Sequence, residues 1–342
     1  MISGRMELRG GEPRAHEESS SATGRCPGEG GLKVETTSQQ SASRDTKTGQ
    51  TRGRLFEDAS DYVVVGTGAG GATAARVLAE AGHSVIMLEE GGWLNRAPAT
   101  LPPTMLSSFR KSFRGIGSVT TQGTAPIPLL QGRCVGGSTA INCGILWRMP
   151  EDVKQDWRDN FGLDELVDDQ ALARIFTQLE QELEAAETSE DLFGGNGALM
   201  AAAAQALGLP GKAMVRNAAR CVGSAQCNLG CPTGARQSME VSYVPRAQKH
   251  GARLYTGMRA TRVRKSQGRA AFVEGKVSSE AAKANGGAKR FKIHARKGII
   301  VACGVVHTPL LLQSSGIKRM VGERFQAHPG VAIVGRFGTP VR

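Results

Sequence analysis

A glycine-rich turn between two apolar segments is the feature that most constrains the fold of this chain. The β-branched run YVVVG leads into Gly66, Gly68 and Gly71, which have the spacing GxGxxG, and a helix-forming stretch follows. A second apolar segment, HSVIMLEEGG at 83–92, then predicts another strand. Strand, glycine turn, helix and strand together predict a βαβ unit and therefore an α/β fold with a parallel sheet.

Each glycine of this turn has a structural role that a larger residue could not fill. The first permits a tight turn, the second lets the backbone approach a pyrophosphate, and the third allows the helix to pack on the strand. Glu89 lies 18 positions after Gly71, where a carboxylate can accept hydrogen bonds from a ribose, and Glu90 is the weaker candidate. A ligand-free turn would not need this distal acid. The pattern fits FAD and NAD equally, because both carry the same ADP half.

Further segments resemble one enzyme family. GRCVGGSTAINCG at 132–144 closely resembles the flavin-contacting signature of the glucose-methanol-choline (GMC) oxidoreductases, and GVVHTPLLLQSSGI at 304–317 is similar to a second signature. WRMPEDVKQDW at 147–157 and the cysteine-rich segment 221–247 are similar to the long-chain-alcohol and cholesterol-oxidase-like branch. The resemblance covers roughly residues 60–342 and favours FAD over NAD as the cofactor.

The resemblance implies a set of FAD contacts. The double glycine would bring backbone amides against the cofactor, while Ser138 and Asn142 would place short polar side chains at the edge of the flavin ring. Arg133 would offset phosphate charge, and the backbone of Ala260 would contact adenine. The expected cofactor-binding residues are Gly66, Gly68, Gly71, Glu89, Arg133, Gly136, Gly137, Ser138, Asn142 and Ala260.

The same resemblance implies the oxidation of a CH–OH group, with hydride transfer to the flavin and transfer of the hydroxyl proton to a histidine. In the family that histidine and its His or Asn partner lie near the C-terminus. This chain ends at Arg342 in a segment that resembles an early strand of the substrate domain. We therefore expect an N-terminal portion without the catalytic pair. His307 and His328 are poor substitutes, because their segments indicate helix packing and a strand entrance.

Several alternatives stay open for function and partners. The chain could be a non-catalytic FAD-binding fragment, or a complementing C-terminal chain could supply the rest. The expected substrate is a small-molecule alcohol of apolar character, and the electron acceptor is oxygen or another oxidant. Cys221, Cys227 and Cys231, spaced C-x5-C-x3-C, could belong to an iron–sulfur subunit or hold zinc. That spacing matches no standard metal pattern, so we expect free thiols.

Composition divides the chain into segments. The first is rich in Gly, Ser, Thr, Glu and Arg and offers almost no apolar side chain to bury. Residues 151–209 indicate two amphipathic helices, and the proline-rich stretch 93–131 indicates an irregular crossing. The expected order is a disordered tail (1–54), the first part of a Rossmann-like FAD-binding domain (55–150), a helical cap with the cysteine loop (151–250), a strand meander returning to the FAD-binding domain (251–312), and the start of an incomplete α+β substrate domain (313–342).

Charge and targeting signals bear on whether the protein binds nucleic acid, spans a membrane or is secreted. The net charge of +12 is uneven, and the basic side chains of the C-terminal third are scattered through strand-like segments with few aromatic residues among them. We therefore expect a solvated basic face and no nucleic-acid partner. No apolar run approaches the roughly 20 residues that a transmembrane helix needs, and the N-terminus lacks the apolar stretch of a signal peptide. Together with seven cysteines, an odd number, these features predict a cytoplasmic protein with reduced thiols.

Overall fold

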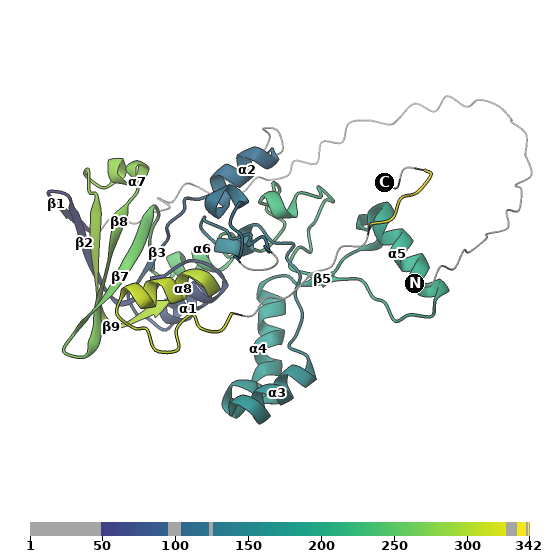
Figure 1. Ribbon diagram of the computed structural model, residues 1–342, viewed down its shortest axis with the longest axis horizontal. Helices are drawn as coiled ribbons and strands as arrows, with labels where there is room; N and C mark the ends of the chain where they lie inside the picture. The colour runs from purple at the N-terminus through teal and green to yellow at the C-terminus, as the bar shows by residue number, and fades with distance from the viewer. Residues whose placement is uncertain (1–48, 95–103, 123–125, 326–333, 340, 342) are drawn as a thin grey trace, which may run out of the picture. The chain divides into compact units, whose positions relative to one another are not determined.

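A seven-stranded sheet in the order β6-β3-β2-β9-β8-β7, with β1 beside β2, organises the structure (Figure 1). The structure is a computed structural model that describes residues 49–94, 104–122, 126–325, 334–339 and 341. The central strands pair in parallel, whereas β7, β8 and β9 form an antiparallel meander. This confirms the expected α/β class. The strands are β1 Gln50–Arg52, β2 Leu55–Val65, β3 Val85–Leu88, β6 Arg253–Tyr255, β7 Met258–Ser266, β8 Arg269–Val277 and β9 Arg290–Val301.

The predicted βαβ unit is present as β2, α1 (Ala69–Glu80) and β3. Successive side chains of a strand point to opposite faces of the sheet. In β2, Val64 belongs to the apolar cluster under α1, whereas Val63 and Val65 belong to the cluster on the other face. Both faces are covered, which explains why these strands read as continuous apolar runs rather than as alternating ones.

Helices complete both apolar clusters. α6 (Tyr243–Lys249) packs beside α1, and its Val244 and Ala247 are buried in the first cluster. α8 (Gly304–Ser314) follows β9 and packs against β7, with Leu311 buried in the second cluster. α7 (Ser279–Ala284) lies between β8 and β9 and is capped by the Ser278 side chain.

Strand β9 is long and joins two apolar segments of the sequence. FKIHA (291–295) and the GIIV of 298–301 lie in one strand that pairs with β2 from Leu55↔Arg290 to Val65↔Val301. The register shifts between Ser60 and Tyr62. The long β2 strand offers backbone partners along its whole length, so the basic, partly exposed middle of β9 continues the strand despite its polarity.

The remaining helices lie between β3 and β6 in the sequence. Two of them match the helices expected between residues 151 and 209, and α3 is an additional one. They are α2 Met105–Ser112, α3 Glu151–Phe161, α4 Asp169–Glu182 and α5 Gly194–Ala206, with short 3-10 turns η1 Arg114–Gly117, η2 Gly137–Ala140, η3 Asp164–Val167, η4 Glu190–Leu192 and η5 Cys227–Leu229, and a two-stranded pair β4 Ala186–Glu187 and β5 Val215–Arg216. No helix in the described part of the chain is both long and apolar enough to cross a bilayer.

Two expected boundaries and one expected irregular segment need correction. The tail was expected to reach residue 54, but β1 already pairs with β2, so order begins earlier; residues 1–48 lie outside the described part. The expected irregular crossing contains α2, because the Thr104 side chain accepts a hydrogen bond from the Ser107 N–H and caps the helix. The boundary at 312 falls inside α8, and residues 326–333 lie outside the described part.

Candidate functional site

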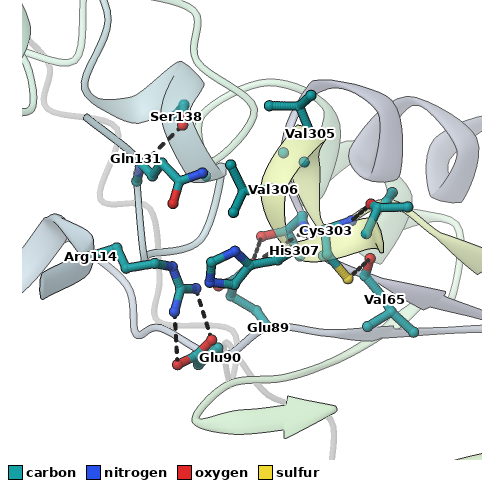
Figure 2. A pocket seen from close by; sticks show the side chains of 18 of the residues that line it. Val65, Glu89, Glu90, Arg114, Gln131, Ser138, Cys303, Val305, Val306 and His307 are labelled. Carbon is teal, nitrogen blue, oxygen red and sulfur yellow. Dashed lines mark hydrogen bonds and ion pairs between the residues drawn. The ribbon is translucent and has the colours of Figure 1, made fainter. Parts of the chain in front are cut away.

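A cavity of about 1040 Å³ opens where the parallel strands β2, β3 and β9 end (Figure 2). Its walls come from the loops that follow these three strands, from β7, from the first turns of α8 and from the segment 128–142. Small-molecule and cofactor sites span about 300–1,000 Å³, so this cavity can hold a large ligand. It lies where open α/β sheets bind ligands, because β3 and β9 leave β2 on opposite sides.

The three glycines of the first turn have different surroundings. Gly66 has a left-handed backbone (φ +99°), and a Cβ there would meet the Ala302 carbonyl oxygen at 2.3 Å. A Cβ on Gly71 would meet the Gly66 carbonyl oxygen at 2.0 Å. Gly68 has no protein atom within 4 Å of its Cβ position and lines the cavity. Gly66 and Gly71 are therefore required for packing, whereas Gly68 keeps space open.

The N-terminus of α1 faces the same space. Gly68 is the N-cap residue, no side chain caps the helix, and its first turn contains no acidic residue. The first N–H groups of a helix have no intrahelical partner and carry a partial positive charge. A phosphate group of a ligand is a suitable partner for them.

The second glycine segment meets the first. A Cβ on Gly137 would lie 3.1 Å from the Cα of Gly68, and both residues line the cavity. The N–H of Gly136 donates to the Thr67 hydroxyl (3.1 Å), which in turn donates to Glu89 (2.7 Å). Segments about 70 residues apart in the chain are thus joined through one threonine.

Glu89 is buried at the end of β3 and lines the cavity. Its Oε2 accepts hydrogen bonds from the Thr67 hydroxyl (2.7 Å) and N–H (3.2 Å), and its Oε1 accepts one from the Gly91 N–H (2.9 Å). Burial raises the pKa of Glu89 above its usual value, although these hydrogen bonds oppose the rise. A carboxylate accepts about four hydrogen bonds, so capacity remains for a ligand hydroxyl.

Glu90 forms the polar corner of the cavity with two arginines. Arg114 donates to both carboxylate oxygens of Glu90 (2.8 and 3.4 Å), and the Arg259 guanidinium lies 3.9 Å from one of them. Burial alone would raise the pKa of Glu90, but the hydrogen bond and charge of Arg114, with the charge of Arg259, lower it overall. All three side chains line the cavity, so this corner carries two positive charges and one negative charge.

Arg133 was expected to offset phosphate charge, but the structure does not place it on the cavity. Its N–H donates to the Ser112 carbonyl (2.7 Å), and its neighbour Cys134 is fully buried. In extended backbone successive side chains point in opposite directions, so Arg133 is exposed. Arg114 and Arg259 are the arginines on the cavity wall.

The other expected contacts divide into two groups. Ser138 accepts a hydrogen bond from the Gly132 N–H (3.0 Å), and Asn142 accepts one from the Gly144 N–H (2.9 Å). Expected residues that line the cavity are Gly66, Gly68, Glu89, Gly137, Ser138, Asn142 and Ala260, whereas Gly71, Gly136 and Arg133 do not. Gly71 and Gly136 act through packing and the Thr67 hydrogen bond.

A buried arginine holds the loop that carries Asn142. Arg236 is 1% exposed, and its guanidinium donates to the carbonyls of Ala140, Asn142 and Cys227. Burial lowers the pKa of Arg236. The cysteine-rich loop and the second glycine segment are therefore joined through one side chain.

The cysteines of this loop accept separate hydrogen bonds. Cys227 accepts from an Arg216 N–H (2.9 Å), Cys231 from the Arg236 backbone N–H (3.4 Å) and Cys221 from the Gly223 N–H (3.4 Å). Within the described ranges no group of three or more His, Cys, Asp or Glu side chains is arranged to hold a metal ion.

Of the two histidines considered as catalytic substitutes, His307 lines the cavity and His328 lies outside the described residues. Figure 2 shows the His307 ring pointing toward Arg114 and Glu90, away from Ser138. The sequence around His307 indicates helix packing and does not predict that the ring faces the cavity.

Comparison with known proteins gives consistent matches. The sequence model of a family described as "GMC oxidoreductase" matches residues 60–330. An uncharacterized GMC-type oxidoreductase of Sinorhizobium fredii is 33% identical over 82% of this chain and 54% of its own length. A long-chain-alcohol oxidase of Arabidopsis thaliana is 29% identical over 81% of this chain and 37% of its own length. The chain thus spans about half, or less, of the length of these relatives.

A solved structure supports the fold. Formate oxidase of Aspergillus oryzae, studied for FAD modification, superposes with a TM-score of 0.52 and 17% identity, covering 76% of this chain and 48% of that one. At this identity the likeness concerns the fold alone.

Proposed function

Because this chain belongs to the GMC oxidoreductase family, we propose that it binds FAD in the cavity and forms the cofactor-binding part of an enzyme that oxidises an alcohol. The observation that carries the proposal is the meeting of two glycine turns, at Gly68 and Gly137, on one cavity at the carboxyl ends of parallel strands. The first turn alone would not separate FAD from NAD, because both carry the same ADP half, whereas the second turn resembles a flavin-contacting signature.

The residues present fit FAD. The uncapped N-terminus of α1 suits the pyrophosphate, and the open space at Gly68 admits it. Arg114 and Arg259 supply positive charge, and Glu89 retains acceptor capacity for the ribose. We assign the flavin end to the segment that carries Ser138 and Asn142.

When bound, the flavin supplies the acceptor for a hydride from the alcohol carbon. The chain itself orients that group through the backbone of the second glycine segment. Arg236 fixes this segment by holding the carbonyls of Ala140 and Asn142. We assign no proton acceptor to the described residues.

The proposed substrate class is an apolar alcohol. The long-chain-alcohol oxidase of Arabidopsis thaliana supports it. The electron acceptor that reoxidises the flavin is oxygen or another oxidant. A cytoplasmic location stays a prediction.

The test of FAD binding uses two glycine variants. Gly68→Val puts a side chain into the cavity, and its Cβ has no protein atom within 4 Å, so the variant should fold and lose FAD. Gly92→Val is the matched control, because Gly92 also has open space at its Cβ position but does not line the cavity. Flavin absorbance of the purified proteins and of the supernatant after heat release gives the stoichiometry. A colourless wild type that also fails to take up added FAD would contradict the proposal.

FAD binding without turnover is the second candidate. It is motivated by the coverage of the Sinorhizobium relative, of which this chain spans 54%. Anaerobic addition of a long-chain alcohol to the FAD-loaded chain separates the two candidates. Bleaching of the flavin supports oxidation by this chain, whereas unchanged absorbance with FAD bound supports the second candidate.

A further inference from the structure

His307 lies on the face of α8 that borders the cavity. His307, Leu310, Leu311 and Ser314 all line it, and their spacing of three, four and seven places them on one side of a helix. Three hydrogen bonds fix the end of this helix to β7. The Ser314 hydroxyl donates to the Thr261 carbonyl (2.8 Å), the Val263 N–H donates to Ser315 Oγ (2.8 Å), and Arg262 Nε donates to the Ser314 carbonyl (2.9 Å). The imidazole therefore has a defined position relative to the edge of β7.

The ring nitrogen Nδ1 of His307 is buried and has no hydrogen-bond partner within the described part of the chain. Its neighbour Arg114 donates two hydrogen bonds to Glu90 and none to His307. A buried polar atom without a partner costs about 1–3 kcal/mol. A ligand that supplied the missing hydrogen bond would recover much of that cost.

The environment of His307 keeps the ring neutral. Burial lowers its pKa, and the positive charges of Arg114 and Arg259 lower it further, against the charge of Glu90. A neutral imidazole has one N–H donor and one acceptor nitrogen, so it suits an uncharged polar group and gives no charge attraction for phosphate.

We propose that His307 positions the adenosine half of the bound cofactor by a hydrogen bond from Nδ1 to a polar group of that half. The inference rests on the proposed binding of FAD. Figure 2 shows the ring on the side of the cavity that holds Glu89 and Glu90, with Ser138 across from it. Ala260, expected at the adenine, lies on the strand to which α8 is fixed. His307 thus contacts the nucleotide and takes no part in the reaction at the flavin ring.

The test separates the two halves of the cofactor. Flavin-free protein is titrated with FAD, with ADP and with FMN, because ADP carries the adenosine half and FMN does not. His307→Leu should lower the affinity for FAD and for ADP by about tenfold, which corresponds to the loss of one hydrogen bond. The affinity for FMN should stay unchanged. His307→Asn should stay close to wild type, since its amide occupies the place of Nδ1. His307→Gln, whose amide lies near Nε2, should behave like His307→Leu.

His250→Gln is the control, because His250 is exposed and does not line the cavity. Equal ADP affinity in wild type and His307→Leu overturns the inference. A parallel loss of FMN affinity also overturns it, because the residue would then support the whole cavity. If wild type binds neither FAD nor ADP, the proposed function itself fails, which is a distinguishable result.

Discussion

The sheet region and the helical region 151–214 of this chain are stabilised in different ways. Strands β2 and β3 and helix α1 bury side chains on both faces of the sheet. Helices α3, α4 and α5 contain no buried residue. The cavity belongs to the first region, apart from the loops that complete it, so its shape depends on apolar packing.

The helical region is attached at the end of α4 by apolar contacts, since Leu183 belongs to the first apolar cluster and Leu179 packs against it, and by polar contacts. Glu182, near the end of α4, accepts a hydrogen bond from the Tyr243 hydroxyl and pairs with Arg76 (3.2 Å) and Arg246 (3.0 Å). The Arg76 guanidinium also lies 4.6 Å from the centre of the Tyr243 ring. Substitutions in the sheet should therefore act through sterics and core volume, whereas most of those in the helices should act through a few charges and through the apolar contact at Leu183.

The largest effect is expected for Gly71→Val. The new side chain would meet the Gly66 carbonyl at a distance no Cβ can adopt, and the helix would have to leave the strand. A loss of several kcal/mol in the free energy of unfolding should be seen in denaturant titration. Gly70→Ala is the control, because its Cβ position is open and it should be neutral or slightly stabilising. Equal stability of both variants would show that the contact of α1 with its turn is not tight.

Glu182→Gln should have the next largest effect. It removes the charge that Arg76 and Arg246 share, and breaking a fully buried pair costs about 3–5 kcal/mol. Glu182 is 15% exposed, so we expect about 2 kcal/mol. Hydrogen exchange should show faster opening of α4 than of β2. In the control Glu180→Gln, the lost pair with Arg148 is exposed and should contribute less than about 1 kcal/mol; similar losses in both variants would contradict the special role of Glu182.

A pH experiment should show a smaller effect in the sheet region. The pKa of Glu89 is raised in the folded state by burial, so its protonated form is favoured there. The contribution of Glu89 to the free energy of unfolding is fully present below the pKa that the group has in the unfolded chain. It is lost as the pH rises through the pKa of the folded state. The unfolding free energy of wild type relative to Glu89→Gln should therefore fall with rising pH. A difference that grows with pH would mean that the hydrogen bonds to Thr67 and Gly91 outweigh burial.

Met200→Ala should have the smallest effect. Met200 on α5 is 70% exposed, and such surface changes stay within about 0.5 kcal/mol. Ile86→Ala in β3, which is fully buried, should cost about 2–5 kcal/mol. Thermal unfolding of the pair measures the contrast between the two regions directly. A large loss for Met200→Ala would show that α5 packs more tightly than its exposure indicates.

Features that depend on residues close together in the sequence could be predicted from the sequence. The βαβ unit and its glycine turn follow from local spacing, and Glu89 follows from its position at a strand end. The pairing of β9 with β2 could not be read from periodicity, because its middle is basic and half-exposed. Arg114 was missed since only tertiary contact with Glu90 brings it to the cavity. Arg133 does not line the cavity, which could not be predicted because the direction of its side chain depends on the strand-like backbone beside Cys134.

The parallel pairing of β2 with β9 has a consequence for biosynthesis. Cys303, just after β9, is 238 positions from Val65 at the end of β2. At translation rates of about 5–20 residues per second, roughly 10–50 seconds pass between the emergence of the two strands from the ribosome. During that interval one edge of β2 has no backbone partner and can pair with another nascent chain. The yield of native protein in a cell should therefore depend on chaperones that shield this edge.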